Sequence, residues 1–346
     1  MSRLAKVLAI TLPTVLFLMT LIGGYLLGWY WTGFGEYLAP ATTPTQTLER
    51  AKTLWDWLEL LIVPTVLAIA ALLFNQSQRA AQTRLTADRQ QQELLMVYLD
   101  RMSELLLSEP KTDPVHVNVG LRRSVARART HTVLSELDGR RKGIVLTFLY
   151  ESRLIDRESS FVCLSRTDLS KANLYKSDLR RANLRQANLS EAFLRKVNMF
   201  ETSLTGARLS HSNLIGASLY RSSLVLADLS DARLTSADLS EADLSGASLV
   251  SARLVRANLE RAILVGTNLS GADLSYANLS GSDLSGANLQ GADLSHCDLS
   301  NAYLFGATLA DAKLRGAKLH EAVLINADIS QTCITPAVLQ AENVIR

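Results

Sequence analysis

The sequence predicts a rod-like solenoid of short extended segments in its second half and helical segments in its first half. Two observations predict the solenoid. From Leu164 to Ile334 every fifth residue is Leu, Met or Ile, without one insertion or deletion. A small residue, usually Ala, stands two positions before each of them. A repeat this short and this strict constrains the path of the backbone.

A period of five residues excludes the two common regular structures. On an α-helix five residues advance about 500°, so successive leucines would spiral around the whole cylinder. On a straight strand, where side chains alternate, successive leucines would point to opposite faces. The remaining regular path keeps the small residue and the leucine on one side of a short extended segment and then turns a corner. We therefore expect the chain to coil around its own leucines.

The repeat also resembles a known motif, as residues 172–176 (Ala-Asn-Leu-Tyr-Lys) and 287–291 (Ala-Asn-Leu-Gln-Gly) show. Pentapeptide-repeat proteins carry a small residue, Asp or Asn, Leu, Ser or Thr, and a variable residue that is often Gly. The resemblance covers about half of the chain. It implies a right-handed quadrilateral β-helix, a β-solenoid with four repeats per coil, over residues 159–336. At about 4.8 Å per coil, the rod would be roughly 42 Å long.

Stacked coils predict columns of leucines that are spaced by twenty residues. Each buried leucine would contribute about 1.5 to 3 kcal/mol before entropy is subtracted. The inward small site is expected to accept only Ala, Ser, Thr, Val or Cys297. Glycine is expected at corners where φ is positive. One leucine column is Leu164, Leu184, Leu204, Leu224, Leu244, Leu264, Leu284, Leu304 and Leu324, and corner glycines include Gly206, Gly246, Gly271 and Gly286. Residues 337–346 are predicted to form a helix that caps the last coil.

Two apolar runs predict a two-helix transmembrane hairpin within residues 1–78. Residues 7–31 carry no charge, and residues 54–74 carry only Asp56 and Glu59 near one end. Tryptophans lie at the corresponding ends of both runs. Basic residues flank the runs more densely than they populate the loop between them, so the N-terminus and the repeat domain are expected in the cytoplasm. The predicted location is a plasma or thylakoid membrane. The alternative, a signal peptide cleaved near Ala39, leaves this orientation unchanged.

Residues 79–158 predict a cytoplasmic helical adaptor. Residues 76–108 favour a helix that either packs on its neighbours or forms a coiled-coil dimer. Two more helices are predicted over 119–138 and 140–151, separated by Gly139. Residues 125–151 are similar to a segment of membrane-anchored pentapeptide-repeat proteins of cyanobacteria. The apolar stripe of the first helix comprises Leu85, Leu95, Tyr98, Met102 and Leu105 or Leu106, and the second short helix presents Ile144, Val145, Phe148 and Leu149.

Charged side chains supply the candidate interaction surfaces. The outward fifth positions of the first coil form a basic ring for a membrane or a partner, and the coils between residues 262 and 312, which lack Lys and Arg, present an acidic partner surface. The basic residues of the adaptor either meet anionic lipid head groups or form a solvated face. The ring comprises Arg166, Lys171, Lys176 and Arg181; the acidic surface Asp273, Asp283, Asp293, Asp298 and Asp311; the adaptor set Arg122, Arg123, Arg127, Arg129, Arg140, Arg141 and Lys142.

The sequence predicts no catalytic residue, no cofactor and no metal site. The five histidines show no metal-ligand spacing, and His296 and Cys297 are expected on opposite sides of the coil wall. Cys163, Cys297 and Cys333 form no CxxC pair, which favours structural thiols in a reducing compartment. The recurring Asp and Ser residues follow from the repeat. No P-loop, dinucleotide fingerprint or nucleophile elbow is present.

The net charge of +3, from 36 basic and 33 acidic residues, does not indicate a nucleic-acid binder. The predicted function is a non-enzymatic membrane-anchored scaffold whose rod binds an unknown protein partner. The lipid bilayer is a second expected partner, and homo-oligomerisation stays open. One alternative is a regulator or assembly factor of a membrane transport or photosynthetic complex. The other, implied by the resemblance, is a DNA-mimic protein that protects topoisomerases, which the charge balance of the rod disfavours.

Overall fold

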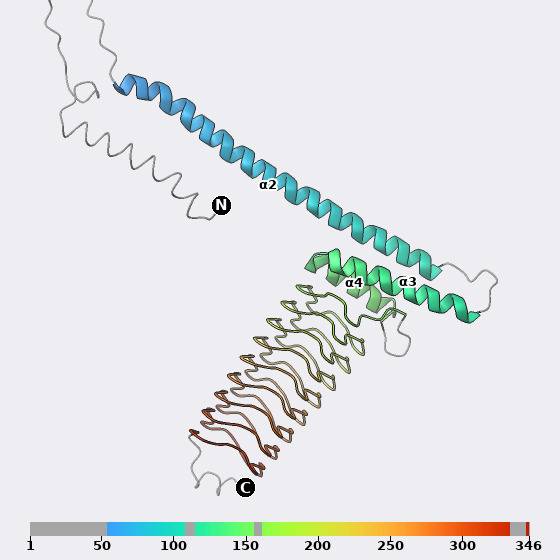
Figure 1. Ribbon diagram of the computed structural model, residues 1–346, viewed down its shortest axis with the longest axis vertical. Coiled ribbons are helices and arrows are strands. Elements are labelled where there is room, and N and C mark those ends of the chain that lie inside the picture. Colours follow the sequence, from blue (N-terminus) through green and yellow to red (C-terminus); the bar gives the residue numbers. More distant parts are fainter. Residues whose placement is uncertain (1–53, 108–114, 156–160, 333–343, 346) are drawn as a thin grey trace, which may run out of the picture. The chain divides into compact units, whose positions relative to one another are not determined.

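The computed structural model describes residues 54–107, 115–155, 161–332 and 344–345. Three helices, α2 (Leu54–Leu107), α3 (Val115–Glu136) and α4 (Gly139–Glu151), precede a stack of coils (Figure 1). The chain divides into two compact units, Met1–Thr86 and Ala87–Arg346. The second unit contains the end of α2, both short helices and all of the coils. It therefore holds every feature that positions a candidate site.

The coils form the predicted β-helix. Every β-bridge between residues 168 and 328 is parallel and joins residues twenty apart, as Ser203 and Ser223 are. In that bridge the Leu204 N–H donates to the Ser223 carbonyl at 2.7 Å, and the Ser223 N–H donates to the Thr202 carbonyl at 3.0 Å. A twenty-residue register with a five-residue repeat gives four repeats per coil. The quadrilateral prediction is confirmed.

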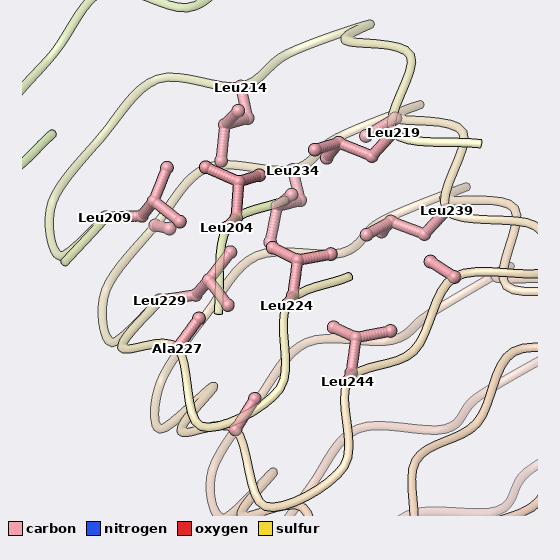
Figure 2. Close-up of a cluster of buried hydrophobic side chains, with 14 of the residues drawn as sticks. Leu204, Leu209, Leu214, Leu219, Leu224, Ala227, Leu229, Leu234, Leu239 and Leu244 are labelled. Carbon is pink, nitrogen blue, oxygen red and sulfur yellow. The ribbon is translucent and has the colours of Figure 1, made fainter. Parts of the chain in front are cut away.

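The leucines fill the interior of the coils. All nine members of the predicted column through Leu164 are buried, and Figure 2 shows neighbouring columns with their side chains pointing inward. The small position two residues earlier is also buried in most repeats, usually as alanine. Four leucines per coil leave no room there for a larger side chain, because protein interiors are close-packed. The core therefore runs along the whole axis of the rod, and stability is distributed along it.

Each corner is a turn whose third residue has positive φ. The N–H of Ala207, for example, donates to the Leu204 carbonyl at 2.8 Å across Gly206, which has a φ of +66°. Glycine was expected at such corners, but charged and aromatic residues also adopt this conformation, as Arg256 and Tyr276 do with φ of 57° and 60°. This left-handed backbone conformation costs a non-glycine residue about 1 to 2 kcal/mol. The register, rather than local preference, therefore sets the backbone at these corners.

The second of the two predicted spans lies at the start of one long helix. Helix α2 continues without interruption from the second predicted span, residues 54–74, into the predicted adaptor. Over the described residues, none of the helices has a stretch both long and apolar enough to cross a bilayer. The first predicted span, residues 7–31, lies outside the described residues. The predicted domain boundary after residue 78 falls inside α2, because the polar residues there still favour a helix.

Part of the predicted apolar stripe of α2 packs inside the second unit. Leu95, Tyr98 and Met102 are buried, and the Tyr98 hydroxyl lies 2.9 Å from that of Thr130 on α3. Leu85, in the first unit, is exposed. Of the two interpretations of this helix, packing on its neighbours accounts for the buried positions.

The end of the chain adds one more rung to the coils. Ile345 forms a parallel bridge with Val323, and the Leu324 N–H donates to the Ile345 carbonyl at 2.7 Å. These bonds satisfy backbone groups that an open β-helix would leave exposed at its last coil. The two described residues of the predicted capping helix are therefore extended, and residues 337–343 and 346 lie outside the described residues.

Candidate functional site

The base of the rod is covered by α4 through two glycines. A Cβ added at Gly139 would overlap the Lys171 carbonyl oxygen, and one added at Gly143 would overlap that of Asn173. The Asn173 N–H donates to the Gly139 carbonyl at 2.7 Å, so the helix occupies the place of a further coil. Gly139 was predicted to separate two helices, and it begins α4 after the N-cap Asp138. Close backbone contact, which the sequence did not reveal, requires glycine here.

Two basic residues of the adaptor set form ion pairs within the protein. The Lys142 side chain is only 4% exposed, and its Nζ donates to Asp168 Oδ2 at 3.0 Å and to the Ser170 carbonyl at 3.2 Å. Arg141 contacts Asp138 and donates to Asp88 Oδ1 on α2 at 2.6 Å. These two residues therefore neither meet lipid head groups nor form a solvated face, which were the two interpretations of this set. They fasten α4 to the first coil and to α2.

The Lys142 contact changes the acidity of its partner. Burial alone would raise the pKa of the Asp168 carboxyl, but hydrogen bonds from Lys142 and Ser170 outweigh burial and hold this pKa below its usual value. The charged form of Asp168 is therefore favoured in the folded protein. The junction between α4 and the first coil loses this contribution in acid.

The predicted basic ring occupies the four corners of the first coil, all at positive φ. Its side chains are exposed but already engaged. Lys171 and Arg181 pair with acidic residues of the next coil, Glu191 at 3.6 Å and Glu201 at 3.0 Å. Arg166 Nε donates to Gln186 Oε1 at 2.7 Å, and Lys176 Nζ lies 5.3 Å from the centre of the Tyr175 ring. The four basic side chains therefore lie at separate corners, and each contacts a different partner within the protein.

The predicted acidic surface is divided among different sides of the rod. Asp273 and Asp293 are bridged neighbours in one column, whereas Asp283 and Asp298 belong to two other columns and Asp311 lies at a corner. Asp293 and Asp298 also pair with Lys313 at 3.4 Å and Lys318 at 3.0 Å. Because the same repeat position returns to a given side only after twenty residues, Asp283 and Asp298 lie on other sides than Asp273 and Asp293. The five carboxylates therefore do not form one surface.

The histidine and cysteine predictions concern the coil wall. Cys297 is fully buried, and burial, more than the nearby Asp298 and Asp293, raises the pKa of its thiol to about 12. His296 points outward and stacks on Tyr276 with ring centres 5.0 Å apart. The opposite orientation of His296 and Cys297 is confirmed. Cys163 is a free thiol, and Cys333 lies outside the described residues. Within the described ranges no group of three His, Cys, Asp or Glu side chains could hold a metal ion.

One side of the rod, here called the Asn183 face, carries exposed apolar residues that the sequence interpretation missed. It comprises the outward columns that begin at Asn183 and Arg185. Toward the last coils these columns present large apolar side chains, of which Tyr303 is 54% and Phe305 52% exposed. Bridges connect the coils of this face from Asn183 to Ile345. Reading every twentieth residue would have found four of these exposed residues, Ile263 with Val265 on one coil and Tyr303 with Phe305 two coils later, beyond Asp283 and Ser285. The fifth, Ile345, is bridged to Val323 on the coil after Tyr303. These five residues are here called the apolar cluster.

At its other end the Asn183 face meets α3 in a cleft of about 270 Å³. His131 of α3 lies 3.2 Å from the Cys163 carbonyl, which connects the helix to the first coil beside the cleft. The lining residues are all polar or basic, and none of them is acidic. They are Arg127, Ser165, Arg166, Asn183, Arg185 and Gln186.

Comparison with known proteins relates this architecture to solved structures. HetL, a pentapeptide repeat protein of the cyanobacterium Nostoc sp. strain PCC 7120 involved in heterocyst differentiation regulation, is 32% identical over 54% of this chain and 90% of its own, with a TM-score of 0.45. A pentapeptide repeat protein from the Arabidopsis thaliana thylakoid lumen is 30% identical over 28% of this chain and 72% of its own, with a TM-score of 0.24. QnrB1, a plasmid-mediated fluoroquinolone resistance protein, is 21% identical over 54% and 88%, with a TM-score of 0.31.

No curated protein sequence matches the chain. The family model for pentapeptide repeats does match, with eight copies over residues 163–199, 202–240, 227–264, 262–301 and 302–340. These segments span half of the chain, and up to residue 332 they coincide with the coils that the structure describes. The protein therefore belongs to the pentapeptide-repeat family.

Proposed function

We propose that the protein is a non-enzymatic interaction scaffold whose rod binds a protein partner through the Asn183 face. The observation that carries this proposal is the exposed cluster of Ile263, Val265, Tyr303, Phe305 and Ile345. Grouped exposed apolar side chains are typical of interaction surfaces. Tyrosine in particular contributes strongly to binding at such surfaces.

The architecture of the rod supports this function. Its surface side chains are attached to a rigid backbone. Parallel bridges join residues twenty apart on successive coils, and a continuous leucine core fills the interior. A partner that binds such a surface does not have to order it first, so less binding energy is lost to conformational entropy. A rigid, preformed surface of this kind suits recognition rather than a reaction cycle that needs movement.

The experiment compares two double variants of the full-length chain that differ in the face they alter. Tyr303→Ser with Phe305→Ser removes the aromatic pair of the Asn183 face. Tyr175→Ser with Phe193→Ser removes a Tyr and a Phe of similar exposure, 50% and 56%, from the opposite face. Proteins cross-linked to the wild-type chain in its native cells are identified, and binding of each is then measured with purified components.

We expect the Asn183-face variant to weaken binding of the identified partner at least about tenfold, while the control variant binds as the wild type does. Equal binding by all three chains would remove this face from the proposal. A partner that is a transport or photosynthetic subunit would assign the scaffold to regulation or assembly of that complex.

Membrane anchoring with the repeat domain in the cytoplasm stays a proposal that rests on the sequence. The support is the uncharged run of residues 7–31 and the basic residues that flank it. Cell fractionation with an alkaline wash tests it, with a chain lacking residues 1–53 as the comparison. Release of the full-length chain by the wash would contradict integral anchoring. The basic ring and the acidic residues likewise remain predictions as contact surfaces.

A further inference from the structure

We propose that the cleft between α3 and the first two coils binds a small phosphate-bearing anion. Three arginines line it, Arg127 on α3 and Arg166 and Arg185 on consecutive coils. No carboxylate is among the lining residues. Arginine presents several N–H donors in a fork that matches phosphate oxygens, so this set of side chains suits a phosphate ester.

The charge of the cleft is not neutralised by the described residues. Arg166 Nε donates to the neutral amide oxygen of Gln186 at 2.7 Å. Within the described part of the chain, the guanidinium groups of Arg127 and Arg185 make no hydrogen bond or ion pair. On the first coil, Lys171, Arg180 and Arg181 all pair with carboxylates. The cleft therefore gathers three arginines without a carboxylate among its lining residues.

The neutral lining residues add hydrogen-bonding groups of the right kind. The Ser165 hydroxyl lies 3.0 Å from Cys163 Sγ, and the Asn183 amide oxygen accepts the Arg185 backbone N–H at 3.3 Å, which leaves the Asn183 amide nitrogen as a donor. A phosphate monoester carries a charge of about −1.5 to −2 at neutral pH and accepts several such bonds. It offsets most of the charge of three arginines.

The size of the cleft limits the ligand. A volume of about 270 Å³ lies near the small end of ligand pockets. It accommodates a phosphate with a small organic group, either free in solution or as the head group of a lipid. The cleft joins a helix of the adaptor to the base of the Asn183 face, so an anion bound there contacts both parts.

The test uses the full-length chain and glycerol 3-phosphate, a phosphate monoester, in titration calorimetry. Vesicles that contain phosphatidic acid carry the same group on a lipid and form the second arm. Arg127→Gln and Arg185→Gln each remove one guanidinium that has no partner to lose. Arg195→Gln is the matched control, because Arg195 occupies the same exposed repeat position as Arg185 on the opposite face. Circular dichroism and the thermal midpoint verify that all variants fold.

We expect saturable binding in at least one arm, weakened about tenfold or more by each of the two cleft substitutions and unchanged by the control. Binding of glycerol 3-phosphate identifies a soluble ligand, whereas binding of vesicles alone identifies a lipid head group. Absence of saturable binding in both arms overturns the proposal. So does an equal loss in Arg195→Gln, which would indicate general charge attraction rather than this cleft.

Discussion

The base of the rod and its middle are built in contrasting ways. In the middle, one rule places every residue: separation by five moves it to the next side, and separation by twenty returns it to the same column. At the base, single contacts between unlike elements decide the structure, such as the approach of Gly143 to the Asn173 carbonyl and the buried pair of Lys142 and Asp168. Substitutions should therefore act locally and sharply at the base and mildly in the middle.

The largest effect is expected from Gly143→Ala. The new Cβ would overlap the Asn173 carbonyl oxygen, which belongs to the backbone and cannot move aside cheaply. We expect a loss of about 3 kcal/mol in the free energy of unfolding, measured by urea denaturation. Gly120→Ala on α3 is the control, because nothing lies within 4 Å of its added Cβ, and it should stabilise the helix by about 1 kcal/mol. Equal effects would show that the close contact is absent.

The next effect concerns the charged pair at the same junction. Lys142→Met leaves Asp168 without its nearly buried partner. Because the Asp168 side chain is 38% exposed, water partly replaces that partner, and we expect the free energy of unfolding to fall by about 2 kcal/mol at neutral pH. Since the folded-state pKa of Asp168 is lowered, its contribution is complete above the unfolded pKa of about 3.9 and is lost as pH falls through the folded value.

Urea unfolding across this acid range, performed on Asp168→Asn, checks the sign. The variant should lose less stability between neutral and acid pH than the wild type. Asp228→Asn serves as the control, because Asp228 accepts the Ser230 N–H at 3.0 Å in the same column but lies far from Lys142. A pH profile of Asp168→Asn identical to that of the wild type would contradict a role for this pair.

A smaller effect is expected from Gly266→Ala in the middle of the rod. Its φ is +64°, and nothing lies within 4 Å of an added Cβ, so only the backbone conformation is tested. The cost should be about 1 kcal/mol by denaturant unfolding. A loss as large as that of Gly143→Ala would mean that the regular coils are no more tolerant than the base.

The smallest expected effect has the opposite sign. The Ser212 hydroxyl is buried and has no hydrogen-bond partner within the described residues. Ser212→Ala should therefore stabilise the rod by about 0.5 kcal/mol. In Ser222, at the equivalent inward position, the hydroxyl donates to the Leu219 carbonyl at 2.7 Å, so Ser222→Ala should not stabilise. Thermal unfolding of both variants shows whether the inward small site prefers apolar side chains.

The same contrast explains how far the sequence could predict the structure. The repeat assigned Leu204 to the interior and His296 to the exterior because a strict period leaves no choice of register. It could not reveal that Gly139 approaches the first coil, since that contact depends on how a helix docks. The acidic residues near the tip were grouped by their distance in sequence, although Asp273 and Asp283 are ten residues apart and so lie on opposite sides. The arginine cleft depends on the placement of α3, which no periodicity encodes.

The five-residue unit also governs how such a rod can change its geometry over evolution. Insertion of one repeat between Asn183 and Ile263 would keep the leucine core intact while turning all later coils by a quarter of a circle. Insertion of four repeats would restore the original alignment and only lengthen the rod. The angle around the rod axis between the arginine cleft and the apolar cluster is thus set by a whole number of repeats, and it changes in steps of about 90°, since a coil has four sides. Their present position on the same face is one of the four relative orientations that the leucine core permits.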